Sequence, residues 1–262
     1  MLAHIERLGE RSIYLIQDLG RMGIFLSLAV RAIFNRPFRF GELVRQIGLV
    51  GASSLILIFF TASFTGMVLG LQGYYALRQF SAEGAIGPMV ALTLLRELGP
   101  VLTALMIIGR VGSAICAEIG IMRNSEQIDA LECMAVDPFR YLIAPKFLAL
   151  IISVPLLTLI FNVVGILGGY VAVVLLLGLN PGSYFSAIEM SVVNQDINMG
   201  IIKSLVFALL IVWICAGRGY FVHQIRSAGF GAEGVSRATT QAVVISSISV
   251  LAANYLLTAI LI

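Results

Sequence analysis

Charged side chains are scarce in this sequence. Asp, Glu, Lys and Arg make up 12% of its 262 residues, whereas hydrophobic residues make up 59%. Soluble domains usually carry about one quarter charged residues, and half that amount cannot cover a surface that faces water. This scarcity excludes a soluble globular enzyme and a disordered chain. A net charge of only +3, without a basic stripe, excludes a nucleic-acid binder. The composition therefore predicts an integral membrane protein.

Residues that commonly carry catalysis or bind metals are also few. The chain has two histidines, His4 and His223, and its three cysteines, Cys116, Cys133 and Cys215, form no Cys-x-x-Cys pair. It contains no GxSxG, HExxH or GxxxxGK[ST] motif. We therefore expect free thiols, no metal site, no cofactor and no catalytic activity in this chain. Any ATP-driven work requires a partner ATPase that binds the ATP and its Mg²⁺.

Long runs without charge locate the membrane spans. A spanning helix needs about 20 mostly apolar residues, because the bilayer core is about 30 Å thick. One such run lies between Arg45 and Arg78, and another extends from Ala238 to the C-terminus. The runs predict an all-α integral membrane protein with a single transmembrane domain over residues 1–262. Its five expected transmembrane helices cover about residues 47–77, 85–116, 142–176, 198–221 and 238–261.

The distribution of basic residues predicts the orientation of these spans. Seven arginines precede the first span, and Arg123, Arg140 and Lys146 follow the second. The loop between the first two spans contains only Arg78, and the loop after the third contains no basic residue. Because basic loops stay in the cytoplasm, we expect a cytoplasmic N-terminus and a C-terminus at the outer face.

The N-terminal segment, residues 1–40, has apolar residues near helical spacing with charges between them. Acidic residues among its apolar positions argue against a signal peptide. The pattern favours an amphipathic helix lying in the cytoplasmic interface of the membrane. A soluble leading helix is the alternative.

Two adjacent charges, Arg96 and Glu97, interrupt the second span. Charges near membrane depth face protein or a wet cavity, because each costs at least about 2.5 kcal/mol on insertion scales. Neighbouring residues on a helix point about 100° apart, so these two cannot simply neutralise each other. They form either the polar lip of a substrate cavity or a pair of interhelical salt bridges. Gly99 and Pro100 follow and permit a local bend.

Small residues recur at close-packing spacing in two spans. Gly109, Ser113 and Ala117 share one helix face, and Gly112, Cys116 and Gly120 share a neighbouring one. The third span carries Gly165, Gly168 and Gly169. Such residues let helix backbones approach closely in lipid, so we expect these faces to pack against other helices.

The most polar stretch of the chain, residues 118–140, lies on the expected cytoplasmic side. Asn124 and Gln127 resemble a capping box for a short amphipathic helix over 125–134. Asp137 is suited to cap the next helix, with Pro138 in its first turn. The short helix is either a docking element for a partner's groove or a connector lying on the headgroups.

Several long motifs occur in order along the chain: GMVLGLQG (66–73), ALTLLRELGP (91–100), GRVG (109–112), AEIGIMR (117–123), EQIDAL (126–131), VDPFRY (136–141) and SRATT (236–240). Together they resemble the MlaE/YrbE family, the permease subunits of Mla-type (lipid asymmetry) ABC transporters. The likeness runs from about Arg21 to Ala259.

The resemblance implies a homodimer of permeases in the bacterial inner membrane. ABC ATPase subunits and STAS-domain subunits would lie on its cytoplasmic side, and a hexameric MCE-domain protein on its periplasmic side. The assembly would move phospholipid between the inner membrane and the periplasmic or outer-membrane side, maintaining outer-membrane lipid asymmetry.

The resemblance also assigns roles to individual residues. A lipid cavity between two permeases would be lined by Leu69, Leu77, Phe80, Arg96 and Glu97. A coupling helix within residues 124–135 would contact the ATPase through Glu126, Gln127, Asp129, Leu131 and Glu132. A proton-coupled secondary transporter with Glu97 as the proton carrier is the alternative function.

Overall fold

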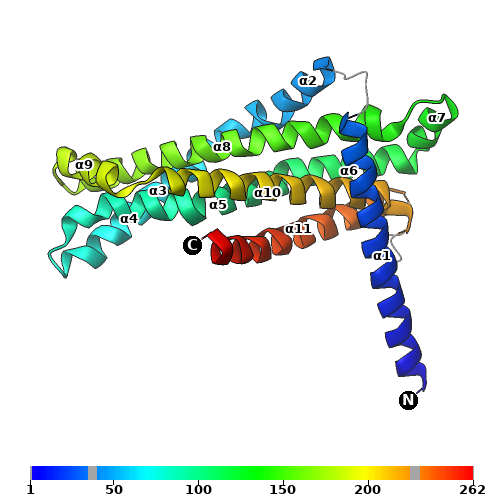
Figure 1. Ribbon diagram of the computed structural model, residues 1–262, viewed down its shortest axis with the longest axis horizontal. Helices are drawn as coiled ribbons and strands as arrows, with labels where there is room; N and C mark the ends of the chain where they lie inside the picture. The colour runs from blue at the N-terminus through cyan, green and yellow to red at the C-terminus, as the bar shows by residue number, and fades with distance from the viewer. Residues whose placement is uncertain (1, 35–39, 225–230, 262) are drawn as a thin grey trace.

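The computed structural model describes residues 2–34, 40–224 and 231–261. These residues form helices joined by turns, with no strand among them. Most of the long helices run side by side along the long axis of the molecule (Figure 1). Among the described residues, five helices are long and apolar enough to cross a membrane: Phe40–Arg78, Glu83–Asn124, Phe139–Leu176, Asn194–Tyr220 and Gly231–Leu261. The all-α membrane fold expected from the sequence is confirmed.

These five long helices are built from shorter elements. The first comprises α2 (Phe40–Val50), η1 (Ala52–Ser54) and α3 (Leu55–Arg78), and the second η2 (Glu83–Ala85), α4 (Ile86–Thr93), η3 (Leu94–Leu98), α5 (Gly99–Ile107), η4 (Ile108–Gly112) and α6 (Ser113–Asn124). The third comprises η5 (Phe139–Ile143), α8 (Ala144–Tyr170) and η6 (Val171–Leu176), and the last two are α10 (Asn194–Tyr220) and α11 (Gly231–Leu261). The other elements are α1 (Leu2–Phe34), α7 (Gln127–Cys133), α9 (Pro181–Ser191) and η7 (Val222–Gln224). The expected spans fall within these helices, except that α10 ends one residue earlier, at Tyr220.

Wide turns interrupt the second long helix and form the two ends of the third. The segments η3, η4, η5 and η6 are π-helical. Such turns insert a residue into an α-helix and often occur at functional sites. Arg96 and Glu97 lie in η3, and Arg110 lies in η4.

Glycines bring α3 and α8 into close contact. A Cβ atom on Gly66 would lie 1.8 Å from the carbonyl oxygen of Gly165, and one on Gly168 would lie 2.4 Å from that of Ser63. Any larger side chain at these positions would therefore push the two helices apart. The packing role expected for the glycines of the third span is confirmed.

The two small-residue faces of the second span differ. Gly112, Cys116 and Gly120 are buried, and a Cβ on Gly112 would meet the Cys215 sulfur of α10 at 2.9 Å. The neighbouring face packs less closely: Gly109 is exposed with nothing within 4 Å of a Cβ, whereas Ser113 and Ala117 are partly buried. Within a single chain, close packing is therefore confirmed only for the face of Gly112, Cys116 and Gly120.

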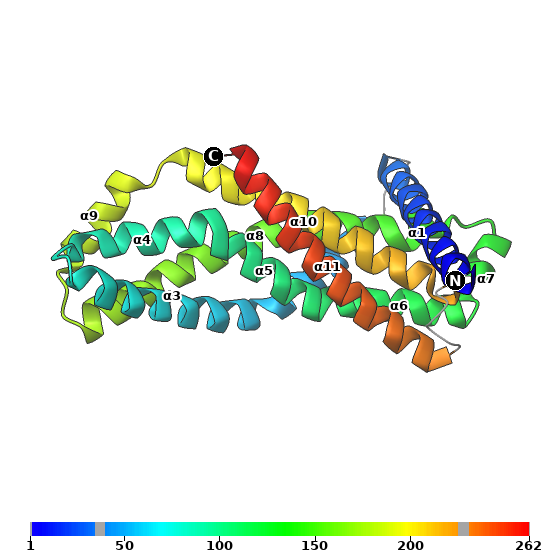
Figure 2. The same ribbon diagram turned by 90° about the horizontal axis from the view of Figure 1, so that it is seen from below.

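Helix α1 lies at a steep angle across one end of the bundle, the end that also carries α7 (Figures 1 and 2). The Trp213 indole donates to the carbonyl of Met22 at 2.8 Å, and Arg218 pairs with Asp18 at 2.7 Å. Phe25 is fully buried, and its ring centroid lies 5.7 Å from that of Tyr220. These contacts attach α1 firmly to α10, while its position in a membrane interface stays a prediction.

Candidate functional site

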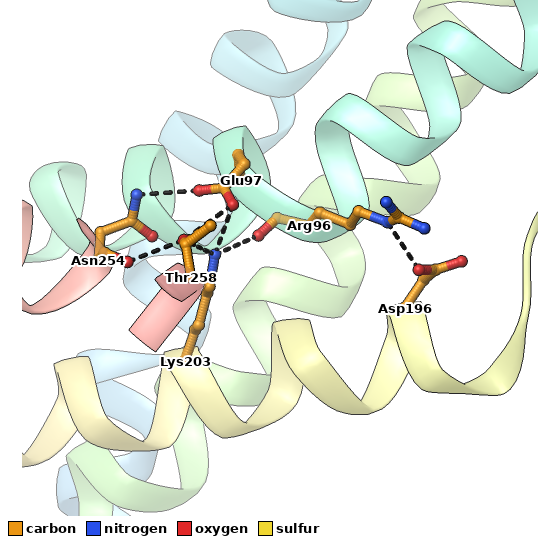
Figure 3. A network of polar contacts seen from close by, with 6 residues as sticks. All are labelled: Arg96, Glu97, Asp196, Lys203, Asn254 and Thr258. Carbon is orange, nitrogen blue, oxygen red and sulfur yellow. Dashed lines mark hydrogen bonds and ion pairs between the residues drawn. The ribbon is translucent and has the colours of Figure 1, made fainter. Parts of the chain in front are cut away.

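The candidate site is a network of charged and polar side chains around Arg96 and Glu97 (Figure 3). The Glu97 carboxylate pairs with Lys203 of α10, and Arg96 pairs with Asp196 of the same helix, both at 2.7 Å. Asp196 and Lys203 are seven residues apart, which is about two helical turns, so they share a face of α10. Of the two alternatives left open by the sequence, interhelical salt bridges are therefore present.

Pro100 prepares the backbone for this network. Proline has no N–H, so it cannot donate to the carbonyl four residues earlier, which belongs to Arg96. The π-turn compensates in part, since the N–H of Gly99 donates to Leu94 instead. The free Arg96 carbonyl accepts a hydrogen bond from the Lys203 ammonium at 2.8 Å. A local backbone defect thus creates a cation-binding oxygen.

Lys203 is fully buried, yet each of its donors has a partner. Its ammonium contacts the Glu97 carboxylate, the Arg96 carbonyl and the Thr258 hydroxyl within 2.8 Å. An ammonium has three hydrogens, so these three acceptors satisfy it completely. Glu97 is held equally well, because Thr258 and Asn254 of α11 lie 2.9 Å from its two oxygens. The network therefore joins η3, α10 and α11.

Arg96 is the open part of the network. Its side chain is 43% exposed, whereas that of Asp196 is 6% exposed. The terminal guanidinium nitrogens point away from Glu97 (Figure 3). Arg96 borders a pocket of about 190 Å³ that is also lined by Asp196, Val193, Gln195, Met199 and Leu261. Arg96 thus forms a salt bridge and also borders a pocket, while its role at the lip of a substrate cavity stays a prediction.

The apolar residues expected to line a lipid cavity are spread along α3 and the turn that follows it. Leu69 and Leu77 are half-buried and pack against the core. Phe80 lies beyond the end of α3 and is 78% exposed. The structure does not bring these three residues to the Arg96 pocket within one chain, so their role in a cavity stays a prediction.

The expected capping box at Asn124 is wrong. Helix α6 continues through Asn124, whose amide donates to the carbonyl of Gly231 at 2.9 Å. The turn is made instead by Glu126, which has a left-handed φ of 56°, and α7 begins at Gln127 without a side-chain cap. The other cap is confirmed, because the N–H of Phe139 donates to Asp137 at 2.9 Å.

The short helix α7 is oriented by Arg123. This guanidinium pairs with Asp129 at 2.7 Å and lies 5.2 Å from the centre of the Tyr220 ring. Ile128 is buried, which fixes the inner face of α7. Among the residues expected to couple to an ATPase, Glu126, Gln127 and Glu132 are exposed, while Asp129 and Leu131 are partly buried. The exposed face of α7 is therefore acidic and polar.

Sequence reasoning missed four members of the charged network: Asp196, Lys203, Asn254 and Thr258. Asp196 and Lys203 could have been found from the sequence, because opposite charges two turns apart in a span indicate ion-pair partners on another helix. Asn254 and Thr258 could not, since single polar residues are common in spans and their contacts depend on tertiary packing.

Apolar spans around a buried ion-pair network define a polytopic membrane protein. The sequence model of the family described as Permease MlaE matches residues 43–260. The chain belongs to this permease family.

Relatives match almost the whole chain. It is 45% identical over 258 residues to the Intermembrane phospholipid transport system permease protein MlaE of Haemophilus influenzae, covering 98% of this chain and 97% of the relative. It is 42% identical to a Probable ABC transporter permease protein of Rickettsia bellii, with 98% of each chain covered. The chloroplastic Protein TRIGALACTOSYLDIACYLGLYCEROL 1 of Arabidopsis thaliana is 31% identical, covering 89% of this chain and 65% of the relative.

Proposed function

We propose that the chain is the membrane-spanning subunit of an ABC transporter that moves phospholipid. Transport would run between the bacterial inner membrane and the periplasmic or outer-membrane side, and would maintain the lipid asymmetry of the outer membrane. The name of the Haemophilus influenzae relative, a phospholipid transport permease, supports this proposal. The N-terminus would be cytoplasmic and the C-terminus periplasmic.

The energy for transport would come from partner subunits. The chain has no P-loop motif, so ABC ATPase subunits would bind ATP and Mg²⁺. Helix α7 would be their docking element, because Glu126, Gln127 and Glu132 present exposed polar groups at the end of the bundle. STAS-domain subunits on the cytoplasmic side and a hexameric MCE-domain protein on the periplasmic side would complete the assembly.

A second copy of the chain would form the lipid cavity. In their most apolar stretches, the spans Phe40–Arg78 and Gly231–Leu261 have only 22% and 11% of their residues buried, compared with 50% or more in the other three. A homodimer would cover part of these two spans. A cavity between the copies would then combine the Arg96 level with Leu69, Leu77 and Phe80.

The open side of Arg96 is the observation that carries the lipid assignment. A phospholipid has an anionic phosphate and two apolar tails. Arg96 keeps its charge oriented through Asp196, yet its side chain also borders a pocket. A guanidinium with free donors suits a phosphate group.

The proton-carrier alternative places a different demand on Glu97. A carrier must bind and release a proton during each cycle. Lys203, Thr258 and Asn254 each donate a hydrogen bond to this carboxylate. Protonation would remove the charge that pairs with the buried Lys203 ammonium and would add an O–H among three donors, so the geometry favours a structural anion.

Reconstitution separates the two functions. The chain is placed in vesicles with its co-purified ATPase, and transfer of a fluorescent phospholipid is followed with ATP, without ATP, and with a pH gradient alone. We expect transfer only with ATP, and a several-fold slower rate for Arg96→Gln at unchanged assembly. Transport by the chain alone, driven by the pH gradient, would refute the proposed function.

A further inference from the structure

A second groove lies on the molecule away from the Arg96 pocket. It has a volume of about 200 Å³ and runs between α2, the η4–α6 segment and the start of α8. Leu49, Val50, Val111 and Ile115 form apolar walls, and two cations, Arg110 and Lys146, border the groove. Leu49 is 57% exposed, so the groove opens on the outside of the chain.

Arg110 differs from four other basic residues on the long helices. Arg96, Lys146, Lys203 and Arg218 each pair with a carboxylate within 2.7 Å. Within the described ranges, no carboxylate oxygen lies within 4 Å of the Arg110 guanidinium, whose hydrogen-bond partner is the buried Ser54 hydroxyl at 3.2 Å. This contact uses one of five N–H donors, so most of the guanidinium is available to a ligand.

The charge of the groove favours an anion. Glu118 also borders it, but this carboxylate is neutralised by Lys146 at 2.6 Å. Gln46, Ser53 and Ala114 add no charge. The sum over the groove is therefore one positive charge, which is that of Arg110.

The position of Arg110 corresponds to one edge of the hydrocarbon layer. It follows Glu97 by thirteen residues, which is about 20 Å along a helix. Charges appear on each described span from this level toward α7: Arg45, Glu118, Lys146, Arg218 and Arg237. Between the two levels, the segments 98–109 and 204–217 contain no charge. Arg110 therefore lies near headgroup depth, with the apolar groove walls beside it.

We infer that this groove binds one phospholipid of the leaflet on the α7 side, with its phosphate on Arg110 and its headgroup in the groove beside Leu49 and Ile115. Its acyl chains would leave Arg110 toward the Glu97 level, where the segment 98–109 contains no charge. The π-turn η4 exposes Arg110 and the adjacent Gly109, where nothing lies within 4 Å of a Cβ. The backbone beside the guanidinium is thus open to a headgroup. This inference rests on the proposed function only in taking the long helices to cross a bilayer.

Photolabelling in vesicles tests the inference without ATP or partner subunits. The full-length chain is reconstituted in phosphatidylethanolamine and phosphatidylglycerol that contain a phosphatidylethanolamine with a photoreactive group near its phosphate. Labelled peptides are then mapped by mass spectrometry. We expect labelling of segments 46–53 and 110–115. It should fall about tenfold in Arg110→Gln, the expected effect of losing a charge-assisted contact.

Matched variants separate lipid binding from a loss of structure. Ser53 is exposed, so Ser53→Asp should fold normally and should reduce labelling as strongly by placing a carboxylate beside the phosphate. Arg110→Lys should retain part of the labelling. Arg45→Gln is the control, because Arg45 is 67% exposed and pairs only locally with Glu42. Labelling near the Arg96 pocket should not change in any of them.

Three results would overturn the inference. The first is equal groove labelling in Arg110→Gln and the unmodified chain. The second is displacement of the label by excess inorganic phosphate, which would identify a site for the free ion. The third is crosslinking of Leu49 to a second protein chain. ATP-driven transfer is measured separately, so groove labelling without transfer would refute only the proposed function, and transfer without groove labelling only this inference.

Discussion

The Lys203 ammonium lies 2.7 Å from the Glu97 carboxylate in a position where the lysine has no exposure to solvent. Breaking a buried pair by removing one partner typically costs about 3–5 kcal/mol, because the remaining charge stays buried. The Arg96 carbonyl and the Thr258 hydroxyl would still hold the ammonium. We therefore expect Glu97→Ala to lose about 3 kcal/mol of stability, and Glu97→Arg to lose more by placing two cations together.

The double variant Glu97→Gln, Lys203→Met distinguishes stability from transport. It removes both charges, so its melting temperature in detergent should recover most of the loss seen in Glu97→Gln.

We expect Glu97→Ala and Glu97→Arg to impair lipid transfer while dimer assembly persists. Normal transfer by both would refute a role of Glu97 in the cavity.

The acidic face of α7 should couple ATP hydrolysis to transport. Glu126→Ala removes an exposed charge and should leave the melting temperature nearly unchanged. Asp129→Ala also frees Arg123, so its effect should include a looser α7. For both, we expect ATP hydrolysis without matching lipid transfer, measured on the assembled transporter.

An exposed carboxylate at the other end of the molecule provides the control for α7. Glu189 lies in α9, and Glu189→Gln should keep hydrolysis and transfer coupled. Full coupling in the Glu126 and Asp129 variants would mean that α7 is a connector and not a docking element.

Gly66 should tolerate no side chain. A Cβ there would lie 1.8 Å from the Gly165 carbonyl oxygen, so Gly66→Ala must separate α3 from α8. Overpacking of this kind costs about 1–3 kcal/mol, and backbone atoms cannot yield as a side chain can. Gly23→Ala on α1 is the matched control, because nothing lies within 4 Å of its Cβ. That variant should gain up to about 1 kcal/mol from helix propensity, and equal melting temperatures for the two variants would contradict the packing.

His223 should make stability depend on pH. Burial lowers the pKa of this imidazole below its ordinary value, Arg123 and Arg21 lower it further, and Asp129 opposes them. The folded protein therefore takes up the proton less readily than the unfolded chain, so stability is present above about pH 6.5 and declines as the pH falls below it. Melting temperatures from about pH 7.5 to pH 5.5 should fall less steeply for His223→Gln. Parallel profiles would show that His223 does not contribute.

The sequence predicted those parts of the fold that depend on solvation along one helix. Charge-free runs identified four of the five apolar helices, and an apolar block interrupted by charges identified the second. Arg96 and Glu97 stood out there because each is costly in a membrane. Their partners could not be assigned, since the contacts with Asp196 and Asn254 join residues about 100 and 157 positions apart. Such contacts are fixed by the crossing of helices, which no local pattern encodes.

The error at Asn124 has a related cause. Asn and Gln at capping spacing favour a helix start, but the Asn124 amide donates its hydrogen bond to the carbonyl of Gly231 at the beginning of α11. A distant segment therefore overrides the local preference. Asp137 capped as expected because its partner is two residues away and depends on nothing else.

Pro100 and Lys203 belong to different helices but serve the same carbonyl oxygen. Pro100 has no N–H to donate to the Arg96 carbonyl, and the Lys203 ammonium on α10 donates to that carbonyl instead. The two positions should consequently covary among homologous chains. In a relative with a residue other than proline at position 100, the backbone N–H of that residue can donate to the carbonyl at position 96. Such a relative is expected to lose Lys203 and Glu97 together.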